Sequence, residues 1–208
     1  MNKKMNRKMN KKMNKKMNLI HDKIYDVVLD SEIIREMEST KKIPGFNINW
    51  IYYHDHNRTL LMTAVFQNCI KLVKYILAAH PDININHQDN NGETVLYRTR
   101  SVYVLKLLLK HKDIDVNIQN NKLGCTILHI LCYSNNIDLI RELLIDARAD
   151  VMIRDNQGKT ARDIAINYEY DEILYILKRI GCTTLLRIPN ASLCKDIVRM
   201  IIEEYVSL

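Results

Sequence analysis

Pairs of adjacent apolar residues recur along the chain with the spacing of one face of an α-helix. In four places two apolar neighbours are followed by further apolar residues four positions later, and mostly polar or charged residues fill the gaps. This spacing is typical of a helix that buries one side. The four sets are Leu72, Val73, Ile76 and Leu77; Val104, Leu105, Leu108 and Leu109; Leu139, Ile140, Leu143 and Leu144; and Ile173, Leu174 and Leu177. The pattern predicts four amphipathic helices of similar design.

A turn precedes each of these predicted helices at a regular distance. Gly92, Gly124 and Gly158 are 32 and 34 residues apart, and each stands two residues before a threonine. Asn57 stands 35 residues before Gly92, again two residues before a threonine. After glycine, asparagine is the residue that best tolerates a positive φ. The four turns therefore predict a structural repeat of about 33 residues.

Each repeat has a second apolar stretch directly after its threonine, and an aspartate-containing tail follows the first three apolar sets. Two short helices and a turn cannot bury their own apolar faces, so we expect the repeats to stack on one another. The second repeat has three residues fewer between Thr94 and its apolar set than the other repeats have. Its first helix is therefore predicted to be short or irregular.

These repeats resemble ankyrin repeats. The family pattern is D-x-x-G-x-T-P-L-H-x-A, then V-V-x-L-L-L, then G-A-D-V-N, and the third repeat reads "GCTILHIL", "IDLIRELLI" and "RADV". The resemblance implies an all-α fold, an ankyrin-repeat solenoid of stacked helix-turn-helix units with β-hairpin-like turns. It covers residues 55–180, and the expected repeats are 55–86, 89–119, 121–153 and 155–180. The family proline is replaced in all four repeats, and the family histidine survives only as His129.

His129 lies between Cys125 and Cys132, so its role has two interpretations. In ankyrin repeats this histidine bonds to the backbone and to the threonine hydroxyl, and the resemblance implies the same structural role here. The alternative is a zinc site with Cys-x3-His-x2-Cys spacing, but it offers three ligands and nothing nearby has the spacing of a fourth. We interpret His129 as structural and predict no metal site.

The segment before the repeats has two parts. Residues 1–18 repeat a four-residue unit and carry eight Lys or Arg residues and no acidic residue. Like charges four residues apart destabilise a helix, so this basic low-complexity tail is predicted to be disordered. Residues 19–54 carry apolar residues at helical spacing, from Ile20 to Ile34, against a charged remainder. They are predicted to form N-terminal capping helices.

Residues 181–208 are predicted to form a C-terminal amphipathic helix, which either caps the last repeat or binds a partner. The segment "LCKDIVRMIIEEYV" resembles the first helix of an F-box, L-P-x-[DE]-I-x-x-x-I-[IL]-x-x-[YFL], with Cys194 in place of the proline. In proteins of large DNA viruses, F-box-like segments follow ankyrin arrays and recruit a cullin-type ubiquitin ligase. The resemblance implies that Ile197, Ile201 and Ile202 would contact the ligase.

The net charge of +7 comes from one end of the chain. Residues 1–18 contribute eight positive charges, so the remaining residues sum to 7 − 8 = −1. Contact with nucleic acid or an anionic membrane is therefore expected only through residues 1–18, where no aromatic residue is present to stack on bases. The five cysteines form no CxxC pair, and no apolar run approaches the ~18 residues of a membrane span. These features predict an intracellular protein of the cytoplasm or nucleus.

The sequence contains no nucleophile–base pair, phosphate-binding loop or paired carboxylates in a repeated context, so we predict no enzyme and no cofactor. The resemblance implies a protein–protein interaction module or scaffold, with a role in host–pathogen interaction, that uses the concave face of its array. The alternative is a substrate adaptor of a ubiquitin ligase. The candidate contact residues are Tyr53, His54, Asn90, Lys122 and Asn156 at the hairpin tips, and Phe66, Gln67, Tyr133 and Ser134 on the inner helices.

Overall fold

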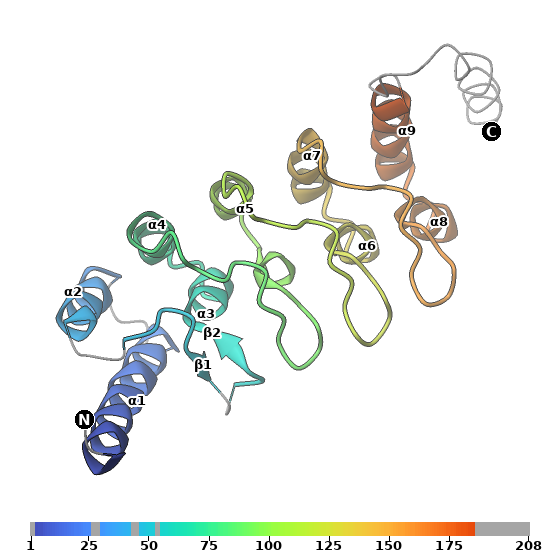
Figure 1. Ribbon diagram of the computed structural model, residues 1–208. Coiled ribbons are helices and arrows are strands. Elements are labelled where there is room, and N and C mark those ends of the chain that lie inside the picture. The colour runs from blue at the N-terminus through green and yellow to red at the C-terminus, as the bar shows by residue number, and fades with distance from the viewer. Residues whose placement is uncertain (1–2, 26–29, 43–45, 53–54, 186–208) are drawn as a thin grey trace. The chain divides into compact units, whose positions relative to one another are not determined.

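The computed structural model describes residues 3–25, 30–42, 46–52 and 55–185 (Figure 1). The chain divides into two compact units, Met1–Asp115 and Val116–Leu208, and each is a stack of short helices. Tyr53 and His54 fall outside the described residues, and so does the predicted ligase contact at Ile197, Ile201 and Ile202. Within the described part of the chain, no helix combines the length and the apolarity needed to cross a membrane.

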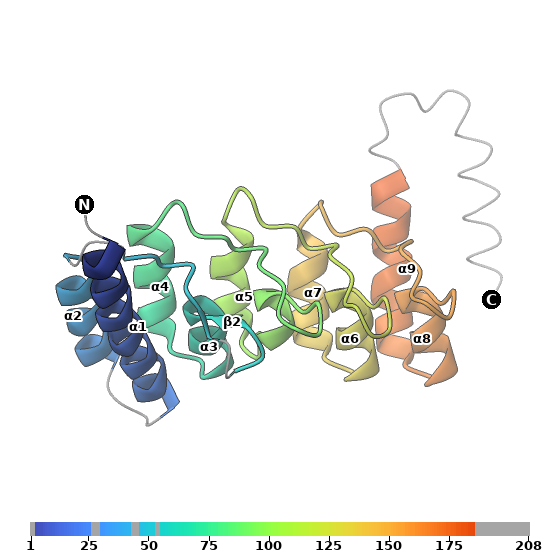
Figure 2. The ribbon, with the colours of Figure 1, turned by 60° about the horizontal axis from the view of Figure 1, so that its bottom comes forward.

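The first unit holds two rows of helices. α1, α3 and the 3-10 helix η1 follow one another in the inner row, and α2, α4 and α5 form the outer row (Figure 2). The elements are α1 (Lys3–Tyr25), α2 (Asp30–Lys41), β1 (Ile51–Tyr52), β2 (Arg58–Thr59), α3 (Leu60–Phe66), α4 (Ile70–Ala79), η1 (Val95–Arg98) and α5 (Val102–Leu109). β1 and β2 form an antiparallel hairpin in which Ile51 pairs with Thr59.

The second unit repeats the same design with two helix pairs. α6 packs against α8 in the inner row, and α7 packs against α9 in the outer row. The elements are α6 (Ile127–Tyr133), α7 (Ile137–Ile145), α8 (Ala161–Asn167) and α9 (Asp171–Leu185). Leu139, Ile140, Leu143 and Leu144 of α7 are all buried, as their spacing predicts.

The missing residues of the second repeat change its inner helix. Val95–Arg98 forms a four-residue 3-10 helix, whereas the inner helices α3, α6 and α8 each have seven residues in α conformation. The predicted short or irregular helix is therefore confirmed. The outer helix α5 keeps its apolar face, because Val104, Leu105 and Leu108 remain buried.

Three asparagines at equivalent positions, Asn49, Asn86 and Asn117, each tie one tail to the next. The Asn49 side chain donates to the Asp82 carbonyl at 3.1 Å and accepts from the Asn84 backbone N–H at 2.6 Å. Asn86 binds Asp113 and Asp115 in the same way, and Asn117 binds Arg148 and Asp150. One amide thus satisfies a backbone donor and a backbone acceptor of the following tail, which would otherwise need water.

The hairpin tips are closed by a side chain at their first position. Oδ1 of Asp89 accepts the backbone N–H groups of Asn91 and Glu93 at 2.8 and 3.1 Å. Asn120 and Asp155 accept two backbone N–H groups each in the third and fourth repeats. These bonds fix the turn without a β-ladder, and among the described residues only the first repeat has paired strands.

The predicted left-handed positions lie at these tips. Gly92, Gly124 and Gly158 have φ values of 73°, 64° and 76°, and Asn57 has a φ of 60°, as predicted from its place in the repeat. Neighbouring tips are joined through the backbone, because Asn156 donates its N–H to the Leu123 carbonyl at 2.8 Å. Gly124 lies next to Asn156 at this contact, where a Cβ would meet the Asn156 side chain and backbone nitrogen.

The N-terminal segment differs from the prediction, because residues 3–25 form the helix α1 instead of a disordered tail. Met13, Met17, Ile20 and Ile24 are buried at no more than 3% exposure. Their spacing of four, three and four residues places them on one helical face. The apolar stripe therefore runs across the predicted boundary at residue 18, and its burial outweighs the repulsion between neighbouring lysines.

α1 and α2 form the predicted capping pair, but the first of them begins inside residues 1–18. Tyr52 donates its hydroxyl to the Met17 carbonyl at 2.6 Å, and the His21 ring stacks on the Tyr52 ring at 3.8 Å. At the start of α2, Asp30 accepts the backbone N–H of Lys71 at 3.0 Å. The cap is thus fastened to the β1–β2 hairpin and to the outer helix α4.

The boundary predicted at residue 181 is also displaced. α9 continues to Leu185, so Gly181 lies within the helix and does not end it. The predicted segment 181–208 therefore begins as the last turn of α9, and its remaining residues, 186–208, lie outside the described part of the chain.

The burial of α1 predicts a large stability effect at Met17. Met17→Ala empties a fully buried position and should lower the free energy of unfolding by about 2–5 kcal/mol. Lys12→Ala, on the exposed side of the same helix, should change it by less than about 0.5 kcal/mol. Urea denaturation of both variants measures the difference, and equal effects would show that α1 is not held by its apolar face.

The two tip glycines of the second unit offer a matched comparison. Gly124→Ala and Gly158→Ala should each cost about 1–2 kcal/mol, because both positions have a positive φ. A Cβ at Gly124 would also collide with the Asn156 side chain and lie 3.0 Å from the Asn156 backbone nitrogen, whereas nothing lies within 4 Å at Gly158. Gly124→Ala should therefore be the more destabilising by about 1–3 kcal/mol in thermal denaturation. Equal losses would mean that the tips do not touch.

Candidate protein-binding surface

The hairpin tips present three of the candidate residues to solvent. Asn90, Lys122 and Asn156 are exposed. Their backbones are held in place, because Asn90 donates its N–H to the His56 carbonyl at 2.9 Å and Asn156 binds Leu123. The tips therefore carry exposed side chains on a fixed main chain. Asn90 lies in the first unit, and Lys122 and Asn156 lie together in the second.

His129 braces the corner between the third tip and its inner helix. Its Nδ1 accepts from the Thr126 N–H at 3.2 Å and from the Thr126 hydroxyl at 2.8 Å, and its Nε2–H donates to the Lys159 carbonyl at 3.1 Å. Both ring nitrogens are occupied, and burial lowers the pKa of His129, so the ring is neutral at physiological pH. The predicted structural role is confirmed.

The neighbouring cysteines are buried thiols that stay protonated at physiological pH. Burial raises the pKa of Cys125 to about 11 and that of Cys132 to about 12. Zinc binds the thiolate form, which these environments disfavour. Among the described residues, no group of three or more His, Cys, Asp or Glu side chains could hold a metal ion.

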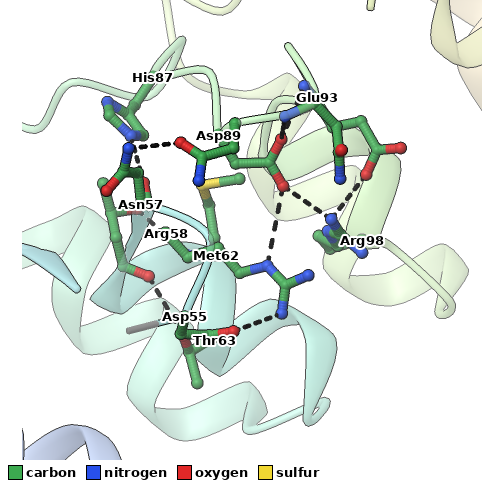
Figure 3. A network of polar contacts seen from close by, with 12 residues as sticks. Asp55, Asn57, Arg58, Met62, Thr63, His87, Asp89, Glu93 and Arg98 are labelled. Atoms are coloured by element: carbon green, nitrogen blue, oxygen red, sulfur yellow. Dashed lines mark hydrogen bonds and ion pairs between the residues drawn. The ribbon is translucent and has the colours of Figure 1, made fainter. Parts of the chain in front are cut away.

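The corner of the second repeat is braced by ion pairs instead (Figure 3). The Asp89 carboxylate is fully buried, and its Oδ2 lies 2.7 Å from Arg98 Nη2 and 3.7 Å from Arg58 Nε. Arg98 also pairs with Glu93, and Arg58 pairs with Asp55. The network links the hairpins of the first two repeats and leaves both arginines mostly buried. It holds the fold and offers little charge to a ligand.

Aromatic side chains gather at the ends of the inner helices in the second unit. The half-buried Tyr133 meets the Tyr168 ring edge-on at 6.0 Å, and Tyr168 stacks on Tyr170 at 5.6 Å. Tyr168 is 47% exposed, and the exposed candidate Ser134 follows Tyr133 in the chain. We call Tyr133, Tyr168 and Tyr170 the tyrosine cluster.

Sequence reasoning identified Tyr133 but missed the other two members. Tyr168 follows Thr160 by eight residues, which is the place that Gln67 and Ser134 take after their own threonines. The same periodicity would therefore have identified it. Tyr170 lies outside the inner helix, and its ring contact depends on the turn between α8 and α9.

The corresponding helix end in the first unit is covered by a cation. The guanidinium of Arg100 lies 4.5 Å from the centre of the Phe66 ring, and Gln67 is the half-buried C-cap of α3. Sequence reasoning missed Arg100, which is exposed in the turn before α5. Phe66 is therefore part of a cation–π pair and not a bare apolar anchor.

Comparisons with known proteins agree with this geometry. The family descriptions "Ankyrin repeats (many copies)" and "Ankyrin repeat" match residues 108–165 and 56–87. The chain is 35% identical over 141 residues to the putative ankyrin repeat protein FPV031 of Fowlpox virus, which covers 64% of this chain and 40% of that protein. It is 25% identical over 174 residues to the ankyrin repeat protein B18 of Variola virus, which covers 76% of this chain and 30% of that protein.

A third relative comes from a plant. The chain is 32% identical over 113 residues to the E3 ubiquitin-protein ligase KEG of Arabidopsis thaliana, which covers 52% of this chain and 7% of that protein. The chain thus spans less than half the length of each of these three relatives. Ankyrin repeats are typically non-catalytic modules that bind other proteins. The helix pairs, the braced hairpin corners and these matches together identify residues 56–87 and 108–165 as ankyrin repeats.

Proposed function

We propose that this chain binds a partner protein through its hairpin tips and inner helices, without catalysing a reaction. The observation that carries the proposal is the tyrosine cluster, in which an exposed ring is held by two neighbouring rings. Tyrosine is enriched among the residues that dominate binding energy, because a rigid ring buries a large area and its hydroxyl can form a hydrogen bond. The cluster is therefore the anchor of the proposed surface.

The tips support this proposal because their backbones are fixed before a partner arrives. The fourth tip is ordered by the Asn156–Leu123 bond and by the Gln157 and Lys159 backbone N–H groups, which donate to the Asp155 carboxylate. A partner that binds ordered groups does not have to supply the free energy of ordering them. Lys122 and Asn156 can then provide polar contacts at the tips.

We also place this function inside the cell, in the cytoplasm or nucleus. Among the described residues, Cys69 and Cys132 are free thiols, and burial raises the pKa of each. Free thiols in a cysteine-containing repeat protein fit a reducing compartment.

Tyr168→Ala tests the proposed anchor. Affinity purification from the native cell should lose the bound protein by about tenfold or more with this variant. Tyr175→Ala is the matched control, because Tyr175 is 57% exposed on the outer helix α9 and should leave binding unchanged. Equal binding by both variants, or equal losses, would place the partner elsewhere on the chain.

A ubiquitin-ligase adaptor is the second candidate function. It is favoured by the F-box-like segment 193–206 and by the relative named as an E3 ubiquitin-protein ligase. That relative matches over only 7% of its own length, so its name describes a much larger protein. The adaptor would hold substrate on the repeats and the ligase on Ile197, Ile201 and Ile202.

Ile201→Asp separates an adaptor helix from a capping helix. In an adaptor the variant should lose co-purification of a cullin complex while the melting temperature stays unchanged, because the carboxylate is buried only in the complex. In a cap the variant should lose several kcal/mol of stability. A wild-type chain that captures no cullin complex would contradict the adaptor function.

A further inference from the structure

The exposed side of α1 carries lysines that the fold does not neutralise. Lys11, Lys12 and Lys15 are exposed, and Lys16 is half-buried. Lys23, further along the helix, pairs with Glu32 and Glu36, whereas none of the four earlier lysines has an ion-pair partner among the described residues. The first acidic residue of the chain is Asp22. We call Lys11, Lys12, Lys15 and Lys16 the lysine face.

The lysine face has a high linear charge density. Its four lysines lie within residues 11–16, which span about 9 Å of helix axis, or about one charge per 2.3 Å. A nucleic-acid duplex carries one negative charge per about 1.7 Å of axis. The two linear charge densities are of the same order and of opposite sign.

We propose that the lysine face of α1 binds the phosphate backbone of double-stranded nucleic acid without reading its sequence. Seven of the eight cations are lysines, which bind phosphate as point charges and lack the paired donors that arginine uses to recognise guanine. No aromatic residue lies within residues 1–18, so stacking on unpaired bases is not available. The surface therefore matches a paired backbone better than a single strand.

The packing of α1 argues against a membrane as the partner. Amphipathic helices that lie in a membrane bury their apolar face among the lipids. In α1 that face is already occupied, because Met13, Met17, Ile20 and Ile24 are buried in the protein. Leu19 is the one large apolar residue described on the exposed side of this helix.

The spread of the lysines around the helix also favours a curved partner. A step of four residues advances about 40° around an α-helix, so the lysine face covers an arc of about 140°. A flat bilayer meets a cylinder along a narrow line, whereas phosphates on both sides of a duplex groove can surround part of it. This second surface is independent of the tyrosine cluster, which lies in the other unit.

The test compares two triple variants of the full chain. Lys11→Gln, Lys12→Gln and Lys15→Gln together remove three charges from the lysine face, and Lys71→Gln, Lys74→Gln and Lys110→Gln remove three exposed charges elsewhere in the first unit. Fluorescence anisotropy with two unrelated 24-base-pair DNA duplexes, at 50 to 200 mM salt, gives the affinity and its salt dependence. Circular dichroism and the melting temperature establish that both variants are folded.

We expect both duplexes to bind with similar affinity, and the plot of log K against log salt to be linear with a negative slope. The lysine-face variant should make that slope shallower by about 2–3, because each phosphate contact contributes about 0.9. Its affinity at 0.1 M salt should fall by at least about tenfold, and the control variant should behave like the wild-type chain.

Three competitors separate the proposal from its alternatives. Poly-L-glutamate of matched charge stands for an acidic protein, vesicles of phosphatidylserine and phosphatidylcholine at 1:4 stand for a membrane, and a 24-nucleotide oligo-dT stands for a single strand. The duplex should be the tightest ligand at equal charge concentration. Tighter or equal binding by any competitor, or equal slopes for the two triple variants, would overturn the proposal.

Discussion

Each repeat of this protein depends on the corner where a hairpin tip turns into an inner helix. The inner helices have seven residues, or four in the second repeat, and isolated helices shorter than about 12–15 residues are marginal in water. Each of these helices begins at a buried threonine with extended φ and ψ, namely Thr59, Thr94, Thr126 and Thr160. A corner that is held by side chains therefore replaces the stability that the helix lacks.

The second, third and fourth corners reach this result by different chemistry. His129 braces the third corner, and Asp163 braces the fourth by accepting from the Thr160 N–H and hydroxyl at 2.8 Å each. In the second repeat the buried Thr94 hydroxyl has no hydrogen-bond partner among the described residues, and the Arg98–Asp89 pair supplies the brace. The repeat that lost residues from its inner helix is thus the one whose corner relies on buried charge, which breaks at a high cost when one partner is removed.

The repeated elements could be predicted from the sequence, whereas the N-terminal segment and the contacts made by the turns could not. The repeat period predicted the outer helices, the positive φ of Asn57 and the role of His129, because each of these follows from a local pattern that occurs several times. Disorder was predicted for residues 1–18 because the segment was considered alone, whereas Met13 and Met17 are buried only in register with Ile20 and Ile24. The contacts of Tyr170 and Arg100 depend on turns, whose geometry a helical periodicity does not contain.

The same reasoning explains where the regular stacking ends. Asn49, Asn86 and Asn117 each bind the backbone of the following tail, and Met152 stands at the next position of this series. A thioether cannot supply both a donor and an acceptor to a backbone. Met152 is accordingly 59% exposed, and its own N–H is bound by Asp150 within the same tail. The amide ladder is therefore interrupted after the third repeat, because the tail that follows α7 offers a thioether where the preceding tails offer an amide.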